Sequence, residues 1–388
     1  MDDKKITLTF TGDIGFDHYM QGKWEDENLI SEEVLEFLRD SDHVIANVEG
    51  PVSRMEKKPL ENSVLKMMHT IDPEVVKVLK KMNVDIWNIN NNHIMDAGED
   101  GVRDTLDEAK KAGALTVGAG MNLDEAKRPV YLKEAGGIGI FAVGYRRGCK
   151  PAGEEKAGCL LWNEMELIKK NIDEIKSKCR WCIIISHGGE EFTSLPTPYT
   201  RDRYLEYLKM GADIIVCHHP HVPMNYETFP GKAIFYSLGN FIFDTDYQRA
   251  QFNTEKGVVL KLKLNEEEFE FEALGIEIER GPEHIIKAEL PLIFRDVDKE
   301  NYEKLAPLSA KAFVEATKRQ QIFLKPEEYK NATAEKWEEN FTNPKRSGRV
   351  EGEALDFFIV CPLAKEADKG AWKESTLEDV KGYILRQL

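Results

Sequence analysis

Ile215-Val216-Cys217-His218-His219-Pro220-His221-Val222-Pro223 places three histidines within four positions, directly after an apolar run. The β-branched residues before the histidines predict a buried strand that ends in a turn at the proline. Open α/β sheets bind ligands at the carboxyl ends of such strands. His219 and His221 stand two positions apart, so in an extended segment both side chains would point to the same side. The stretch therefore favours a metal or catalytic site over a loop whose histidines only form hydrogen bonds.

The same arrangement recurs along the chain, because ligand-type side chains follow other β-rich runs. Taken singly, an aspartate between glycines is often a turn residue, and an asparagine run is often a loop with a helix cap. Repetition after successive strands, with helical patterns between them, instead predicts an α/β fold with a shared site at one edge. The strand ends are Asp13 after 6–10, Asn47 and Glu49 after 44–46, Asn92 and His93 after 84–89, and His187 after 181–185.

Carboxylate, amide oxygen and imidazole together fit Mn²⁺, Fe²⁺ or Zn²⁺, and no thiolate is needed. Two such ions about 3.5–4 Å apart could clamp the oxygen of a phosphoryl or acyl group. We therefore expect one or two divalent metal ions (Mn, Fe or Zn) as the cofactor.

The charge balance limits the partners. The chain has 388 residues, 41% of them hydrophobic, and its net charge of −16 comes from 53 basic and 69 acidic residues. No basic excess exists to pair phosphates, which argues against nucleic acid or an anionic membrane surface as the main partner. An anionic substrate would need a bound cation that reverses the charge inside the site.

No apolar run approaches the roughly 20 residues of a membrane span, so we expect no transmembrane segment and a cytoplasmic chain. An exported form without its leader would look the same. Six irregularly spaced cysteines do not predict a disulfide framework, and the pair Cys179 and Cys182 is interpreted as ordinary thiols.

Three further features carry less specific expectations. Arg146 and Arg147 could bind an anionic substrate or could be solvated, and Glu190 could be a ligand, a base or a surface carboxylate. Strands expected over 257–264 and 269–278 alternate polar and apolar residues, as a half-exposed sheet edge does.

The composition changes at about residue 289, where the chain becomes rich in charge and loses its histidines. Helices are expected over 298–319 and 376–387, with a strand over 355–360. We therefore predict a main domain over 1–288 and an accessory α-rich segment over 289–388, which packs on the main domain or mediates association.

An ordered series of motifs resembles the CapA family of bacterial capsule and poly-γ-glutamate biosynthesis proteins, within the calcineurin-like metallophosphoesterase superfamily. The resemblance runs from about residue 6 to residue 244. It implies a sandwich of two mixed β-sheets flanked by helices, with a C-terminal α-rich extension beyond it. The motifs are Gly12-Asp13, Asn47-Val48-Glu49, Asn91-Asn92-His93-x-x-Asp96-x-Gly98, His187-x-Gly189-x-Glu191, His218-His219-Pro220-His221-Val222 and Ser237-Leu238-Gly239-Asn240-Phe241.

By that resemblance, His93 matches the histidine that protonates the leaving group, with Asp96 or Glu191 orienting it. The first motif departs from the phosphoesterase pattern, because Asp13 is followed by Ile14-Gly15 rather than by a histidine at the second position, and Glu49 replaces a shorter aspartate. The resemblance thus leaves the number of ions at one or two. It implies metal-ligand positions at Asp13, Glu49, Asn92, His187, His219 and His221.

Two kinds of function remain open from the sequence. One is a metal-dependent hydrolase or transferase that uses metal-bound hydroxide with His93 as general acid, on a polyglutamate-type amide in capsule synthesis or processing, or on a small phosphoester. The other is a module that binds an acidic polymer or a partner without turnover.

Overall fold

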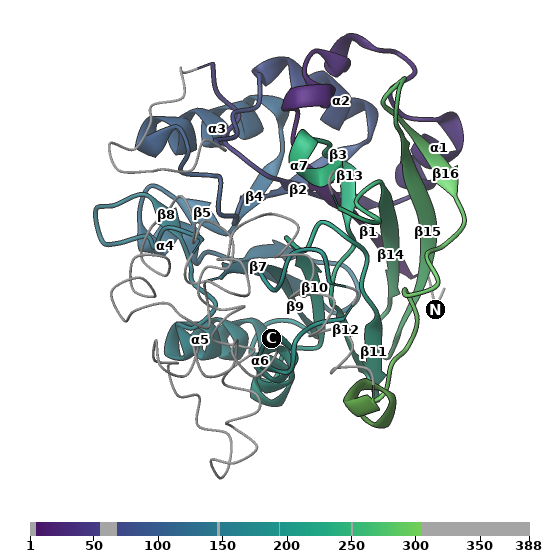
Figure 1. Cartoon of the computed structure of the whole chain (residues 1–388). Helices are drawn as coiled ribbons and strands as arrows, with labels where there is room; N and C mark the ends of the chain where they lie inside the picture. Colours follow the sequence, from purple (N-terminus) through teal and green to yellow (C-terminus); the bar gives the residue numbers. More distant parts are fainter. Residues whose placement is uncertain (1–4, 55–67, 146–147, 194, 250, 305–388) are drawn as a thin grey trace, which may run out of the picture.

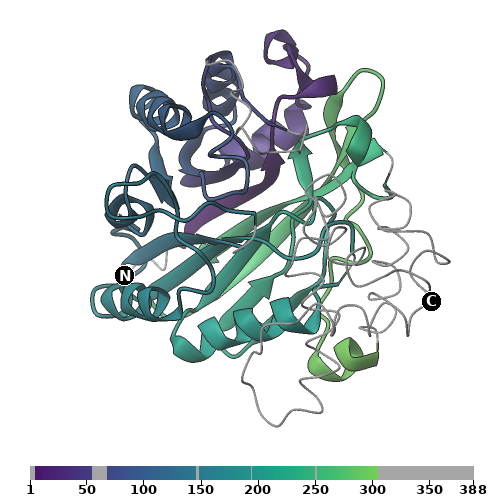
Figure 2. The ribbon, with the colours of Figure 1, turned by 60° about the vertical axis from the view of Figure 1, so that its left-hand side comes forward.

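The computed structural model describes residues 5–54, 68–145, 148–193, 195–249 and 251–304 (Figure 1). Within these residues, two large sheets pack face to face and helices cover their outer faces, as Figure 2 shows from a second side. The sandwich of two mixed sheets flanked by helices that the sequence predicted is confirmed.

The first sheet combines a parallel half with an antiparallel half. β1 to β4 run parallel to one another, while β14 to β16 add antiparallel strands beside β1. Its strands, in spatial order, are β16 (His284–Ala288), β15 (Phe269–Glu279), β14 (Lys256–Leu264), β1 (Ile6–Ile14), β2 (His43–Val48), β3 (Val84–Asn88) and β4 (Leu115–Val117), with β13 (Asn240–Ile242) also paired to β1.

The second sheet is parallel in its centre and antiparallel at both edges. A separate small pair is formed by β5 (Ala119–Gly120) and β8 (Gly158–Cys159). The strands of the second sheet, in spatial order, are β11 (Tyr226–Phe229), β12 (Lys232–Phe235), β10 (Ile214–His218), β9 (Trp181–His187), β7 (Ile138–Gly144) and β6 (Val130–Leu132).

The longer helices cover the outer faces with their apolar side chains. In α5, Ile168, Ile172 and Ile175 recur at helical spacing and are buried against the second sheet. The helices are α1 (Glu32–Arg39), α2 (Val76–Lys81) and α3 (Gly98–Ala112) on the first sheet, α5 (Met165–Lys176) and α6 (Pro198–Met210) on the second, and the short α4 (Leu123–Ala126) and α7 (Asp246–Arg249), with 3-10 turns η1 (His18–Met20), η2 (Lys23–Glu25) and η3 (Pro73–Val75).

The core between the sheets explains the continuous apolar runs. Phe10 and Ile45 of the first sheet face Ile183 and Val216 of the second within one buried cluster. Every residue of β9 and β10 is buried, because helices cover the face that points away from this core. Burying one such side chain contributes about 1.5–3 kcal/mol, so this core holds the two sheets in a fixed relation.

Two details of the strand predictions were wrong, and a further feature was not anticipated. The first strand does not stop before Asp13, because β1 continues to Ile14 with an irregular register after Phe10. The apolar run over 233–243, which is interrupted at Gly239-Asn240, forms two strands in different sheets, β12 in the second and β13 in the first. The strand β14 is almost wholly buried, because Val259 packs into one core cluster while Val258 and Leu260 pack into another; β15 is half-exposed as expected, and β16 is the edge strand on this side.

The accessory segment is described only in part. Residues 289–304 run along the main domain, where Phe294 packs into the core between the sheets and the backbone of Tyr226 pairs with Arg295 and Val297. Residues 299–304 are helical, in the range where a helix was expected. The helix at 376–387, the strand at 355–360 and most of the 298–319 helix lie outside the described residues. None of the helices among the described residues is long and apolar enough to cross a membrane.

Candidate metal centre

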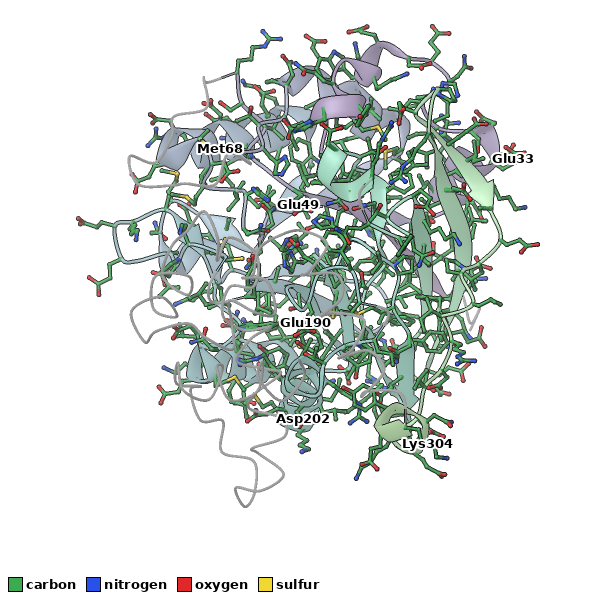
Figure 3. The ribbon with its side chains drawn as sticks, in the orientation of Figure 1. Glu33, Glu49, Met68, Glu190, Asp202 and Lys304 are labelled. Atoms are coloured by element: carbon green, nitrogen blue, oxygen red, sulfur yellow. The ribbon has the colours of Figure 1, made fainter. Side chains whose placement is uncertain are left out.

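The carboxyl ends of parallel strands from both sheets meet at one place. Glu49 is labelled near the middle of the view in Figure 3, and its neighbouring donor residues come from both sheets. The six residues expected as ligands from the sequence lie close together at these strand ends. They are Asp13 from β1, Glu49 after β2, Asn92 after β3, His187 at the end of β9, and His219 and His221 after β10.

Glu49 belongs to two groups of donor atoms. Asp13, Glu49 and His187 form one group, and Glu49, His219 and His221 form the other. In each group the possible ligand atoms lie within 4.8 Å of one another, and every member is buried. Because Glu49 is shared, the arrangement accommodates one ion or two adjacent ions.

Both side-chain oxygens of Glu49 are buried without a hydrogen-bond partner. The neighbouring nitrogens, Nε2 of His187 and Nε2 of His221, lie 3.5 and 3.8 Å from Oε1, beyond good hydrogen-bond distance. A bare carboxylate is costly to bury, and the usual compensation is a cation. The donor set and this unpartnered carboxylate therefore fit a divalent metal ion, whose identity they leave open.

The turn after β10 does not have the extended geometry assumed from the sequence. His219 and His221 have φ values of 97° and 57°, in the left-handed region that residues other than glycine seldom adopt. The two imidazoles reach the same centre because of this turn and not because of strand alternation. Such strain persists where the surrounding structure over-determines it, typically at functional sites.

Asparagine side chains form hydrogen bonds that orient the candidate ligands. Asn47 donates from Nδ2 to Asp13 Oδ1 at 2.7 Å, and Asn88 donates to Asn47 Oδ1 at 2.7 Å. Asn240 Oδ1 lies 2.9 Å from Nδ1 of His221, which leaves Nε2 of that ring free to face Glu49. Outer partners of this kind fix the tautomer and the orientation of a ligating histidine.

Asn92 lies against His187, with its Oδ1 2.8 Å from Nε2 of the imidazole. Two ligands of one ion with bonds of about 2.1 Å stand about 3 Å apart, so this separation is compatible with ligation of one ion by both. Alternatively the contact is a direct hydrogen bond in the absence of a cation.

Burial and neighbouring charges shift the pKa values of the site histidines in opposite directions. Burial lowers the pKa of His187 and of His219 well below its ordinary value, which favours the neutral imidazole that binds metals. Burial also opposes the charged form of His221, yet the Glu49 and Asp13 carboxylates raise its pKa to about 9. Without a cation, His221 thus supplies the positive charge that these carboxylates require.

His93 stands next to Asn92 at the rim of this cluster. Its Nδ1 lies 2.7 Å from Oδ2 of Asp96, so of the two residues expected to orient it, Asp96 makes the hydrogen bond. Burial acts to lower the pKa of His93, but the charge and hydrogen bond of Asp96 raise it above its ordinary value. Glu191 lies close enough for its charge to act on His219 and His221 instead.

Two aromatic side chains and a further histidine lie against the cluster. The ring of Tyr145 stacks on His219 with centroids 4.5 Å apart, and Phe243 lies 4.8 Å from His221. His69 contacts the ring of His93 at 4.1 Å. Phe243 follows the Ser-Leu-Gly-Asn motif and could have been inferred from it, whereas His69 belongs to no strand end and carried no signal.

Glu190 is buried, which contradicts a surface carboxylate, one of the three roles left open for it. Its carboxylate accepts hydrogen bonds from the Thr197 backbone and the Thr200 hydroxyl, and burial raises its pKa to about 7. Arg146 and Arg147 lie outside the described residues. The described cysteines, Cys179 and Cys182 among them, are free thiols.

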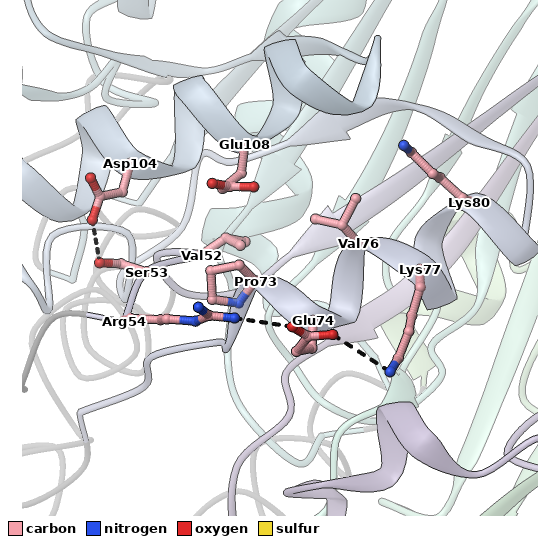
Figure 4. Close-up of a pocket in the computed structure, with 10 residues that line it drawn as sticks. All are labelled: Val52, Ser53, Arg54, Pro73, Glu74, Val76, Lys77, Lys80, Asp104 and Glu108. Carbon is pink, nitrogen blue, oxygen red and sulfur yellow. Dashed lines mark hydrogen bonds and ion pairs between the residues drawn. The ribbon is translucent and has the colours of Figure 1, made fainter.

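A cleft of about 550 Å³ lies beside α2 and α3 and is another place where a ligand could bind (Figure 4). Its charges largely satisfy one another: Arg54 pairs with Glu74 at 3.0 Å, and Ser53 donates to Asp104 at 2.5 Å. None of the six expected ligands lines this cleft. The chemistry-bearing groups are therefore those of the buried cluster.

The sequence is similar to those of known capsule biosynthesis proteins. Residues 7–245 match the family model described as "Bacterial capsule synthesis protein PGA_cap". A protein of Bacillus subtilis named "PGA biosynthesis protein CapA" is 34% identical over 64% of this chain and 66% of its own length. A "Capsule biosynthesis protein CapA" of Bacillus anthracis is 32% identical over 64% of this chain and 62% of its length. The match thus spans slightly less than two thirds of these relatives.

Solved structures are more distant. A hypothetical protein from Thermus thermophilus has a TM-score of 0.44 at 13% identity, covering 70% of this chain and 99% of its own. Purple acid phosphatase PPD1 from yellow lupin has a TM-score of 0.31 at 13% identity, covering 76% of this chain and 55% of its own. Similarity at this level supports no conclusion about function.

Proposed function

The chain belongs to the bacterial capsule synthesis protein family PGA_cap, and from that premise we propose that it is a metal-dependent hydrolase or transferase of poly-γ-glutamate synthesis or processing. The reaction would be attack on a γ-glutamyl-type amide, with His93 as the general acid. The observation that carries the proposal is the buried, unpartnered carboxylate of Glu49 among imidazole and carboxylate donors.

The ion would be held by the carboxylates of Asp13 and Glu49 and the imidazoles of His187, His219 and His221, with Asn92 beside them. A divalent cation bound there would supply Lewis acidity toward a carbonyl or phosphoryl oxygen and would make water a nucleophile near neutral pH. Anionic substrates would be admitted to this acidic protein where a bound cation reverses the local charge.

The remaining steps use the chain's own groups. Asp96 accepts a hydrogen bond from Nδ1–H of His93, so in the protonated imidazolium the second proton, the one available for transfer, is on Nε2. His93 gives that proton to the departing amine or alkoxide. Tyr145 and Phe243 cover two of the imidazoles and exclude water from their faces.

A metal analysis of the purified full chain, followed by turnover assays, tests the proposal. We expect a divalent cation to co-purify, and γ-glutamyl peptide hydrolysis to be abolished by chelator and lowered about 100- to 10,000-fold by His93→Ala. The matched control is His43→Ala, because His43 is bonded to Asp85 through Nδ1 at 2.6 Å in the same manner but at the other end of β2. That control should retain the activity.

The same assays separate the other functions. Turnover of p-nitrophenyl phosphate without any of γ-glutamyl peptides would assign the site to small phosphoesters. Tight binding of poly-γ-glutamate that chelator does not affect, with no turnover of either substrate, would overturn the enzyme and assign a binding module.

A further inference from the structure

A second histidine–aspartate pair lies directly against the first. We infer that His69 and Asp17 position the His93–Asp96 pair for proton transfer, so that the general acid of this chain depends on four residues and not two. The inference rests on the proposed function for its chemical meaning, although the positioning itself can be tested without turnover.

The contact between the pairs is made through one oxygen. Nδ1 of His93 lies 2.7 Å from Oδ2 of Asp96, and the backbone N–H of His69 donates to that same oxygen at 2.8 Å. An oxygen with two donors is held in direction as well as in distance. The orientation of Asp96, and through it that of the His93 ring, is thus set in part by where His69 lies.

The ring of His69 also contacts His93 directly. The two imidazoles meet edge to face, with centroids 4.1 Å apart and an interplanar angle of 87°. Phe243 also packs on His69, with ring centroids 5.2 Å apart. Gly50 also lies against His69. A Cβ at residue 50 would be 3.2 Å from the Cβ of His69, so the glycine leaves the space that His69 needs. The ring therefore has little freedom to turn.

Asp17 secures His69 from the far side. Its Oδ2 lies 2.6 Å from Nδ1 of His69, and both side chains are nearly buried. Asp17 also stands at the N-cap position of η1, where an aspartate commonly accepts a backbone N–H, but its side chain makes no such cap. The carboxylate is directed to His69 instead.

Both histidines therefore use Nδ1 for an aspartate, which fixes the tautomer of each ring. Burial lowers the pKa of His69, and the charge of His93 lowers it further. A neutral His69 can support its neighbour without competing for the proton. Residues that hold a catalytic side chain in place affect the reaction rate. Displacement of a reacting group by about 1 Å lowers the rate roughly 100-fold where the groups must be aligned.

The test compares His69→Phe with His69→Asn in the full chain. Phenylalanine keeps a ring and loses the nitrogen bonded to Asp17, whereas the asparagine amide can occupy the Nδ1 position and donate to it. Asp17→Ala removes the acceptor without changing the ring and serves if His69→Phe fails to fold. His43→Phe is the matched control, because the His43–Asp85 pair has the same 2.6 Å separation and lies away from the cluster.

Two readouts are needed. The first is the Nδ1–H signal of His93 in ¹⁵N-histidine NMR spectra, assigned by its loss in His93→Asn. We expect it to shift or broaden in His69→Phe and Asp17→Ala and to stay in place in His69→Asn and His43→Phe. The second is turnover, where kcat should fall about 10–100-fold in His69→Phe and Asp17→Ala, with KM within about two-fold, and recover in His69→Asn.

An unchanged His93 signal in folded His69→Phe or Asp17→Ala would overturn the inference, as would loss of kcat in His43→Phe of the same size. If the wild-type chain turns over neither substrate, the proposed function fails by itself. The NMR comparison then still decides whether His69 and Asp17 position His93.

Discussion

Replacement of Glu49 by glutamine should abolish the rise in melting temperature that a divalent cation gives the wild-type chain. Glu49 is fully buried, neither of its oxygens has a hydrogen-bond partner, and it belongs to both groups of donor atoms. Removing its charge therefore removes the one ligand that both candidate ion positions share.

The magnitude follows from binding linkage. A cation at 100 times its Kd stabilises the folded state by about 2.7 kcal/mol. At about 2–4 °C per kcal/mol, this raises the melting temperature by roughly 5–11 °C. Without cation, leaving a buried acceptor unsatisfied costs about 1–3 kcal/mol, so Glu49→Gln should melt at the wild-type temperature or above it.

Differential scanning fluorimetry of chelated protein, titrated with Mn²⁺ or Zn²⁺, measures both effects. The matched control is Glu190→Gln, which alters a buried glutamate whose carboxylate is already bonded to Thr197 and Thr200. It should keep the full cation-induced rise. A Glu49→Gln variant that responds to cation as the wild type does would refute the assignment of Glu49 as a ligand.

Three further results are expected. His93→Ala should lower kcat by about 100- to 10,000-fold while leaving cation uptake intact, and loss of uptake measured by metal analysis would argue against a general acid. The Asp85 hydrogen bond raises the pKa of His43 above the ordinary 6.5, so the pair stabilises the fold fully below about pH 6.5 and loses this contribution as pH rises through the raised pKa. Asp85→Asn should therefore destabilise more at pH 6 than at pH 9 in urea unfolding, and an equal loss at both pH values would contradict this. Gly12→Ala should destabilise by about 1–3 kcal/mol or more, because a Cβ there would lie 2.1 Å from the backbone oxygen of Gly239; an unchanged unfolding midpoint would show that the turn can move.

The gathering of the six ligand-type residues could be predicted because chemistry at strand ends is dictated by topology. Parallel strands deliver their carboxyl ends to one edge, so residues as far apart as Asp13 and His221 are brought together by the order of strands alone. The apolar runs before them identify the strands, since both faces of β9 and β10 are covered.

Backbone geometry within turns could not be predicted in this way. The left-handed conformations of His219 and His221 follow from contacts with distant chain segments, and residue spacing alone suggested an extended segment. The turn at Gly239 crosses from one sheet to the other, which an apolar run interrupted by Gly-Asn does not reveal. His69 could not be predicted for a different reason. Its position depends on tertiary contacts with Asp17 and His93 and not on a strand.

The ligand-type residues come from both sheets, Asp13 and Glu49 from one and His187 and His219 from the other. An ion held between them would be a cross-link across the core, joining halves of the molecule that otherwise touch mainly through apolar side chains. Opening either sheet would then require release of the ion, so amide hydrogen exchange in β2 and in β10 should slow together on loading.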